Sequence, residues 1–129
     1  SHLVIGIMPD QKENIARGKM GGSMRLGEYP ATLLKGTIAA KAYGVHSIIE
    51  RHRHRYEVNP LYLDPLKEKG LIFSGMSPDE KLMEIMELPR TKHPFFLGTQ
   101  FHPEFHARPL SPHPLFTAFV QAAYENRKD

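Results

Sequence analysis

The sequence predicts a mixed α/β fold, because short apolar runs alternate with segments that carry helix start and stop signals. The apolar runs at 3–8, 71–76 and 95–101 are too short for ordinary helices and are typical of buried strands. Three other segments, at 37–43, 59–70 and 114–124, have helical signals. The chain has 129 residues, 40% of them hydrophobic and 24% charged, which is typical of one globular domain or a piece of one.

The composition excludes several classes of protein and site. The sequence contains no cysteine, which excludes a disulfide scaffold, a thiolate zinc site and a cysteine nucleophile on this chain. No apolar run approaches the ~20 residues of a membrane helix, and no secretory signal is recognisable. The net charge of +3 permits an anionic ligand without indicating nucleic acid. We therefore expect a cytoplasmic protein that binds neither membrane nor nucleic acid.

The first third of the chain is expected to be extended or irregular. Residues 3–8 form a short apolar run and are predicted to be a buried strand. Residues 9–20 are polar and of mixed charge, and we expect a loop there. Residues 23–34 are predicted to form extended segments interrupted by Gly27 and Pro30.

A short helix and a long extended segment follow. Thr37 is a good N-cap for a helix that continues through Tyr43, and Gly44 is a typical stop signal. Residues 47–58 are predicted to be extended. An Asn59-Pro60 pair then starts a second helix, with Asn as the N-cap and Pro at the first helical position.

The C-terminal half is predicted to contain a β-hairpin, a strand and a terminal helix. Gly70 ends the second helix, and the strand-like runs 71–76 and 81–88 flank a Ser-Pro-Asp-Glu turn. Residues 95–101 are predicted to be a buried strand. Residues 114–124 place apolar side chains at helical spacing. Because the first strand begins almost at residue 1, we expect its partners to lie upstream of this chain.

A His-Pro-Glu sequence directly follows the predicted strand at 95–101. Pro103 restricts His102 to extended geometry, and in an extended segment His102 and Glu104 point to the same side. A carboxylate there can hold one imidazole nitrogen and leave the other as a base, as in a catalytic triad. The spacing is common, so by itself it favours an ordinary strand-end histidine beside a solvated glutamate.

The segment 50–59 is rich in alternating Arg and His. If it is extended, Arg51, Arg53 and Arg55 share one face and two histidines share the other. Three guanidinium groups suit a carboxylate or phosphate ligand, whereas a structural network with the flanking glutamates is the open alternative. His52 and His54 have no second ligand pair at zinc-like spacing, so we expect no metal site.

Together these segments resemble the C-terminal part of the CTP synthase family. The His-Pro-Glu sequence alone would indicate only a class I glutamine amidotransferase, whereas the run at 50–59 is far more specific. The resemblance covers essentially the whole chain. The matching segments are GGSMRLG at 21–27, ERHRHRYEVN at 50–59, SPD at 77–79, FHPEF at 101–105, RP at 108–109 and HPLF at 113–116.

The resemblance implies that residues 1–129 are the C-terminal portion of one flavodoxin-like (Rossmann-like) glutamine amidotransferase domain. The nucleophile half of that domain and the synthetase domain are expected upstream. The family is a ligase of pyrimidine biosynthesis that hydrolyses L-glutamine and uses the ammonia, with ATP and Mg²⁺, to convert UTP to CTP. GTP is its allosteric activator, and the full protein is expected to be a homotetramer. No cofactor is expected on this chain.

The resemblance also assigns roles to particular residues. The family hydrolyses glutamine with a Cys-His-Glu triad, in which His102 and Glu104 match the histidine and the glutamate. Arg55 matches the arginine that holds glutamine. Arg25 matches a position implicated in the response to GTP. The triad cysteine has no counterpart here, so these roles cover only part of the catalytic machinery.

Two alternatives remain open from the sequence. The first is a chain without catalysis that binds an anion or a partner chain through the Arg51–Arg55 strand, and the missing cysteine favours this interpretation. The second is another class I amidotransferase, such as one that serves GMP or anthranilate synthesis. The Arg-rich run at 50–59 argues against the second alternative.

Overall fold

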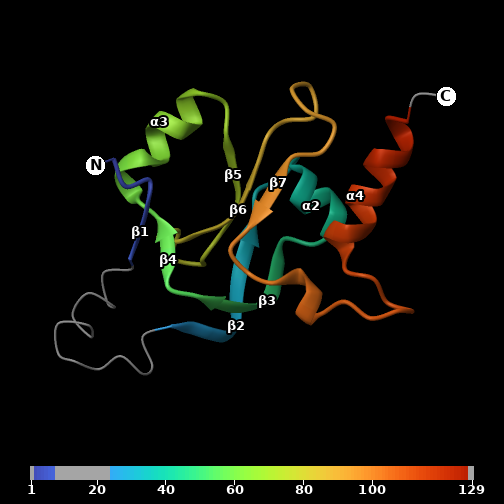
Figure 1. Cartoon of the computed structure of the whole chain (residues 1–129), viewed down its shortest axis with the longest axis horizontal. Coiled ribbons are helices and arrows are strands. Elements are labelled where there is room, and N and C mark those ends of the chain that lie inside the picture. Colours follow the sequence, from blue (N-terminus) through green and yellow to red (C-terminus); the bar gives the residue numbers. More distant parts are fainter. Residues whose placement is uncertain (1, 8–23, 128–129) are drawn as a thin grey trace.

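The computed structural model describes residues 2–7 and 24–127, in which a curled five-stranded sheet separates two groups of helices (Figure 1). The strand order is β3-β2-β5-β6-β7, and every neighbouring pair is antiparallel. The mixed α/β prediction is confirmed. The strands of this sheet are β2 (Arg25–Leu33), β3 (Ser47–His54), β5 (Ile72–Met76), β6 (Met83–Glu87) and β7 (Leu97–Thr99).

A separate two-stranded ribbon pairs β1 (Ile5–Ile7) with β4 (Tyr56–Val58). The prediction of a buried strand at 3–8 is wrong in one respect, because Leu3 is 61% exposed and Ile5 is 50% exposed. The reason is that β1 pairs outside the main sheet and is covered on one side only. The expectations for residues 9–20, and for the glycines at 21 and 22, lie outside the described residues.

Strand β2 is continuous, contrary to the predicted interruptions at Gly27 and Pro30. It pairs with β3 from Arg25 to Thr32, whereas β5 bonds it only at Thr32 and Leu33. Among the described residues, most of β2 therefore has an unpaired edge, where the missing N–H of proline removes no ladder hydrogen bond. Gly27 adopts a φ of 107°, which glycine tolerates within the strand.

The helices begin and end close to the predicted residues. Helix α2 (Ile38–Tyr43) starts where the Thr37 hydroxyl accepts a hydrogen bond from the Ala40 N–H, and it ends at Gly44 in the left-handed conformation. The 3₁₀ turn η1 (Pro60–Tyr62) and helix α3 (Leu63–Glu68) follow the Asn59 cap. The terminal helix is α4 (Pro114–Glu125). Within 2–7 and 24–127, no helix has both the length and the apolar character needed to span a bilayer.

The predicted hairpin is formed by β5 and β6, which pair across the turn after Met76. The Ser77 hydroxyl donates to Asp79 at 2.6 Å and accepts from the Leu82 N–H at 3.0 Å, which fixes the turn. Gly75 is required at the irregular register of this hairpin, because a Cβ there would lie 2.7 Å from the Ile85 side chain.

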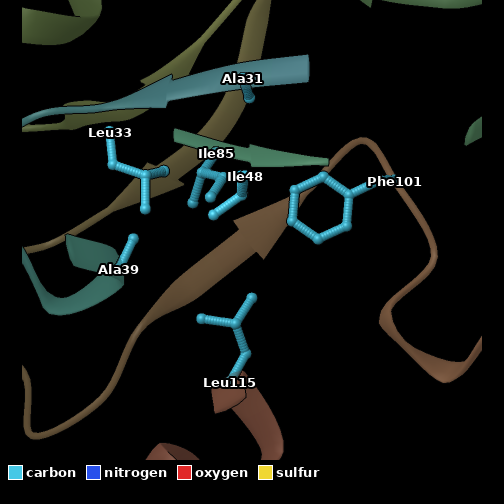
Figure 2. Close-up of a cluster of buried hydrophobic side chains, with 7 residues drawn as sticks. All are labelled: Ala31, Leu33, Ala39, Ile48, Ile85, Phe101 and Leu115. Atoms are coloured by element: carbon cyan, nitrogen blue, oxygen red, sulfur yellow. The ribbon is translucent and has the colours of Figure 1, made fainter. Parts of the chain in front are cut away.

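The hydrophobic core lies between one face of the sheet and the helices α2 and α4 (Figure 2). Ile85 from β6 and Leu115 from α4 are 1% and 4% exposed. Phe101, which follows β7, is also buried in this core. The core therefore fixes the chain immediately before the His-Pro-Glu sequence. The cluster consists of Ala31, Leu33, Ala39, Ile48, Ile85, Phe101 and Leu115.

Candidate active site

His102 and Glu104 form a hydrogen-bonded pair just after the core residue Phe101. His102 Nδ1 lies 2.7 Å from Glu104 Oε1. The His102 backbone is extended, as Pro103 predicts, with φ −108° and ψ 93°. The next residues are not extended as we expected but form the 3₁₀ turn η2 (Pro103–Phe105). The predicted side-chain pair thus forms across the start of a turn rather than along a strand.

This pair has the geometry of a base and the group that orients it. A carboxylate accepts, so Nδ1 of His102 is the donor and Nε2 remains available as a base. The hydrogen bond from His102 lowers the pKa of Glu104, which keeps the carboxylate ionised. The side chains of His102 and Glu104 are 39% and 56% exposed, so both are accessible to a reactant.

Strand β3 holds the turn that carries this pair. The His102 N–H donates to the Arg51 carbonyl at 2.9 Å. The His102 ring stacks on Phe105, with ring centroids 5.0 Å apart, and the Arg51 guanidinium lies 5.9 Å from the Phe105 centroid. Residues that are far apart in the sequence therefore bring the pair against the Arg-rich strand.

The two faces of β3 are as predicted. Its side chains alternate, so Arg51 and Arg53 are exposed and His52 is 1% exposed. Arg55 is exposed at the bend between β3 and β4. Within the described residues, the Arg55 side chain has no hydrogen bond or ion pair, so its guanidinium is free to take an anion.

The buried histidines of β3 are joined in a chain of hydrogen bonds. His54 Nδ1 lies 3.1 Å from the Tyr56 carbonyl, which can only accept, so that nitrogen carries the proton. His54 Nε2 is then an acceptor, and it receives the Nδ1–H of His52 at 2.8 Å. Both rings are neutral in this arrangement. Nε2 of His52 has no hydrogen-bond partner within 2–7 and 24–127.

Arg25 is buried beside these histidines and is paired with two carboxylates. Its side chain donates a short hydrogen bond to Glu84, lies 3.7 Å from Glu57 and stacks over Tyr29. A direct contact between Arg25 and a nucleotide would require it to leave these partners. We call Arg25, His52, His54, Glu57 and Glu84 the Arg25 cluster.

Burial dominates the electrostatics of the Arg25 cluster. It lowers the pKa of His52 to about 3, with a further contribution from the Arg25 charge. Burial and the neighbouring charge of Glu84 raise the pKa of Glu57 to about 7, although Arg25 opposes this shift. The pKa of Glu84 is also raised by burial, despite its ion pair with Arg25. One guanidinium therefore does not fully compensate two buried carboxylates.

The same cluster contains the described residues best placed to hold a metal ion. Ligand atoms of His52, His54 and Glu84 lie within 4.8 Å of one another. The facing nitrogens of the two histidines are already hydrogen-bonded to each other, and Arg25 occupies one oxygen of Glu84. Because a fixed positive charge lies in the cluster, the arrangement favours a hydrogen-bonded network over a cation site.

A second buried network, which the sequence did not predict, is centred on Glu50 of β3. Glu50 Oε1 accepts from the Tyr43 hydroxyl at 2.6 Å and from His113 Nε2 at 2.8 Å. His106 Nδ1 lies 3.1 Å from Glu50 Oε2, close enough for an ion pair but not aligned as a hydrogen bond. We call these four residues the Glu50 cluster. A helix-start signal at His113-Pro114 was visible in the sequence, but the partner of His113 was not.

A cavity of about 170 Å³ lies beside Ile5, Glu84 and Gln100 and therefore adjoins the Arg25 cluster. His102, Glu104 and Arg55 are not among the residues that line it. Within the described residues, no hydrogen bond or ion pair joins Arg55 or Arg25 to the His102–Glu104 pair. The structure thus brings His102 and Glu104 together, leaves Arg55 free and places Arg25 in a separate cluster.

Comparison with known proteins gives a consistent result. The family model for class I glutamine amidotransferases matches residues 5–122. A CTP synthase of Saccharopolyspora erythraea is 58% identical over 127 residues, and one of Rubrobacter xylanophilus is 59% identical over 121 residues. These alignments cover 98% and 94% of this chain, but the chain spans only 22% and 21% of the length of those relatives.

A solved structure has the same fold. The glutaminase domain of Trypanosoma brucei CTPS, with bound acivicin, matches with a TM-score of 0.83 and 36% sequence identity. The match covers 100% of this chain and 48% of that one. The antiparallel sheet with its terminal helix is therefore a recognised part of the amidotransferase fold. On the match to 5–122, the chain belongs to the class I glutamine amidotransferase family.

Proposed function

We propose that this chain supplies the histidine–glutamate pair and the glutamine-binding arginine of a CTP synthase. The observation that carries the proposal is the 2.7 Å contact between His102 and Glu104, which leaves Nε2 of His102 available. The identity of 58–59% to proteins named CTP synthase supports the choice of this enzyme within the family.

The proposed reaction is hydrolysis of the glutamine side-chain amide through a thioester. A cysteine thiolate from outside this chain attacks the amide carbon, and protonated His102 gives its proton to the departing ammonia. Neutral His102 then takes a proton from the water that attacks the thioester, which releases glutamate and the thiolate. Glu104 keeps the ring oriented and stabilises its charged form.

Arg55 is proposed to bind the α-carboxylate of glutamine. Its guanidinium is exposed and unpaired among the described residues. A planar guanidinium can donate two parallel hydrogen bonds to a carboxylate, which a lysine ammonium cannot do. Arg55 therefore contributes to substrate binding rather than to bond breaking.

In the complete protein, the ammonia is proposed to serve a synthetase domain that uses ATP and Mg²⁺ to aminate UTP. GTP is the proposed activator, and a homotetramer is the proposed assembly. Because Arg25 is 7% exposed and paired with Glu57 and Glu84, its proposed part in the GTP response is indirect. It would act by holding β2 in place rather than by contacting the nucleotide.

The decisive experiment compares two nitrogen sources in the complete protein. We expect His102→Ala to abolish glutamine-dependent CTP formation and to leave the reaction with free ammonia largely intact, because ammonia bypasses the pair. His46→Ala, at an exposed histidine, is the matched control and should retain both activities. If His102→Ala lost both activities equally, or kept the glutamine reaction, the proposed role would be wrong.

A second experiment tests Arg55. Arg55→Lys keeps the charge but loses the bidentate geometry, so we expect the KM for glutamine to rise about tenfold or more, as loss of ~1.4 kcal/mol or more of binding requires. The ammonia reaction should not change. Arg90→Lys, at an exposed arginine near α4, is the control. An unchanged KM for glutamine in Arg55→Lys would contradict the assignment.

A further inference from the structure

We propose that Glu50 is a positioning residue, which holds the turn bearing His102 and Glu104 against β3 through His106. This inference rests on the proposed function, because it concerns the same pair. Glu50 does not touch His102 or Glu104 among the contacts of the described residues. Its effect would pass through the residues that follow Glu104.

The turn is attached to β3 at both of its ends. At the first end, the His102 N–H donates to the Arg51 carbonyl at 2.9 Å. At the other end, His106 follows η2 directly, and its Nδ1 lies 3.1 Å from Glu50 Oε2. The two anchor points, Glu50 and Arg51, are consecutive residues of one strand. The pair of attachments fixes both ends of the segment that carries the chemistry.

Inside the turn, further bonds keep its shape. The Phe105 N–H donates to the His102 carbonyl and the His106 N–H donates to the Pro103 carbonyl, both at 3.1 Å. The turn is therefore a short closed unit, in which movement of His106 is transmitted to His102. Loss of the His106 attachment would leave the turn held at one end.

Glu50 is itself rigidly held, as a positioning residue must be. It is 3% exposed, and its Oε1 accepts from Tyr43 of α2 and from His113, the N-cap of α4. The Leu115 N–H donates to His113 Nδ1 at 3.2 Å, so His113 carries its proton on Nε2 and donates it to Glu50. These bonds leave Oε2 of Glu50 facing His106, with no hydrogen-bond donor aligned on it among the described residues.

The hydrogen-bond partners also keep this carboxylate ionised. Burial by itself raises the pKa of Glu50, but the hydrogen bonds from His113 and Tyr43 outweigh it and the pKa lies below its usual value. A charged Glu50 Oε2 can attract His106, which also lies 3.6 Å from Glu28 of β2. Glutamine at position 50 can keep the Oε1 contacts while losing the negative charge that faces His106.

The test uses the complete protein and the same two nitrogen sources. Glu50→Gln should lower kcat for glutamine hydrolysis about ten- to a hundredfold, as expected from a displacement of about 1 Å at a reacting group. The KM for glutamine should change little, because Arg55 is untouched. Ammonia-dependent CTP formation should remain, since it does not use the turn.

Glu87→Gln is the matched control. Glu87 is a buried glutamate on the same sheet, 1% exposed, but it accepts hydrogen bonds from the Ile38 and Ala39 N–H groups of α2 and does not touch the turn. A merely structural role would make Glu50→Gln and Glu87→Gln alike, with both activities lowered together. That result would overturn the proposal.

A second variant keeps the proposal testable if Glu50→Gln does not fold. His106 has a side chain only partly covered by the protein, so His106→Ala should fold and should show the same selective fall in kcat. In the double variant, kcat should fall no further than in the more affected single variant, because both substitutions remove the same Glu50–His106 attachment. Additive falls, or a His106→Ala protein with normal kcat, would contradict the proposal.

The results for His102→Ala and Glu50→Gln together distinguish a failure of the positioning role from a failure of the proposed function. If His102→Ala keeps the glutamine reaction, the proposed function fails, whatever Glu50→Gln does. If His102→Ala loses only the glutamine reaction and Glu50→Gln behaves like Glu87→Gln, the proposed function stands and the positioning role of Glu50 fails.

Discussion

The Glu50 cluster and the Arg25 cluster are both buried against strand β3, yet they satisfy their charges differently. In the Glu50 cluster one carboxylate receives hydrogen bonds from Tyr43 and His113 and faces His106. In the Arg25 cluster one guanidinium faces two carboxylates, Glu57 and Glu84. Glu50 therefore has several donors for one carboxylate, whereas Glu57 and Glu84 share the single guanidinium of Arg25.

The two clusters also differ in how many carboxylate oxygens lack a partner among the described residues. Three of the four oxygens of Glu57 and Glu84, and Nε2 of His52, are buried without a hydrogen-bond partner, whereas Glu50 has one such oxygen, Oε2, which faces His106. The pKa of Glu50 is accordingly lowered, whereas the pKa values of Glu57 and Glu84 are raised. The ratio of donors to carboxylates, rather than burial alone, decides the direction of the shift.

The largest effect is expected from removing the only guanidinium of the Arg25 cluster. Arg25→Met leaves Glu57 and Glu84 buried without a cation, which should cost about 3–5 kcal/mol of stability near neutral pH. Hydrogen exchange of β2 amides in the complete protein measures the local free energy of opening. Arg90→Met, at an exposed pair with Glu125, should change it by less than ~0.5 kcal/mol. A loss no larger than that of the control would show that the two carboxylates do not depend on Arg25.

Glu57→Gln should raise the stability of the protein, which is the opposite of the effect expected for Arg25→Met. The pKa of Glu57 is about 7 in the folded protein, above its usual value, so the folded state binds the proton more tightly than the unfolded state. The stability from this proton is fully present below the unfolded pKa and is lost as the pH rises through about 7. Glutamine resembles the protonated form, so the variant should be more stable than the parent by about 1–3 kcal/mol above that pH.

The measurement is the pH dependence of the same β2 opening free energy. The parent protein should lose stability between its acid range and neutral pH, and Glu57→Gln should show a flatter profile. Asp64→Asn, at an exposed carboxylate paired with Lys67, is the control and should leave the slope unchanged. If the opening free energy of the parent and of Glu57→Gln depended on pH with the same slope, Glu57 would not be the group that binds the stabilising proton.

The smallest effect is expected from Tyr43→Phe. The substitution removes one donor to Glu50 but leaves the His113 hydrogen bond, so the loss should be about 0.5–1.5 kcal/mol. Thermal unfolding of the complete protein, with Tyr124→Phe at a tyrosine that is 60% exposed as the control, measures the difference. A loss as large as that of Arg25→Met would show that the Glu50 cluster has no excess of donors.

The elements with local signals were predictable from the sequence. The Thr37 cap, the Gly44 stop and the Asn59-Pro60 start are decided by residues within one helical turn. The His102–Glu104 pair was predictable for the same reason, because the two residues are separated by Pro103 alone. Its turn geometry was not predicted, since His102 is fixed by the distant Arg51 carbonyl.

The two buried clusters depend on contacts that no local pattern reveals. The Arg25–Glu84 hydrogen bond joins residues 59 apart in the sequence, and the Glu50–His113 bond joins residues 63 apart. The continuity of β2 across Pro30 depended equally on which edge of the strand the other described strands leave unpaired. The alternative of a network between the arginines at 51–55 and the flanking glutamates is not seen among the described residues; Glu57 instead lies near Arg25 of β2.

A structure of the complete protein with acivicin bound, as in the trypanosomal relative, tests the central claim most directly. The distance from His102 Nε2 to the sulfur of the proposed nucleophilic cysteine is the quantity to measure. We predict a separation of roughly 3.5 Å, with Glu104 still bonded to Nδ1 and Arg55 on the carboxylate of the ligand. A His102 ring directed away from that cysteine would contradict the catalytic role proposed for His102.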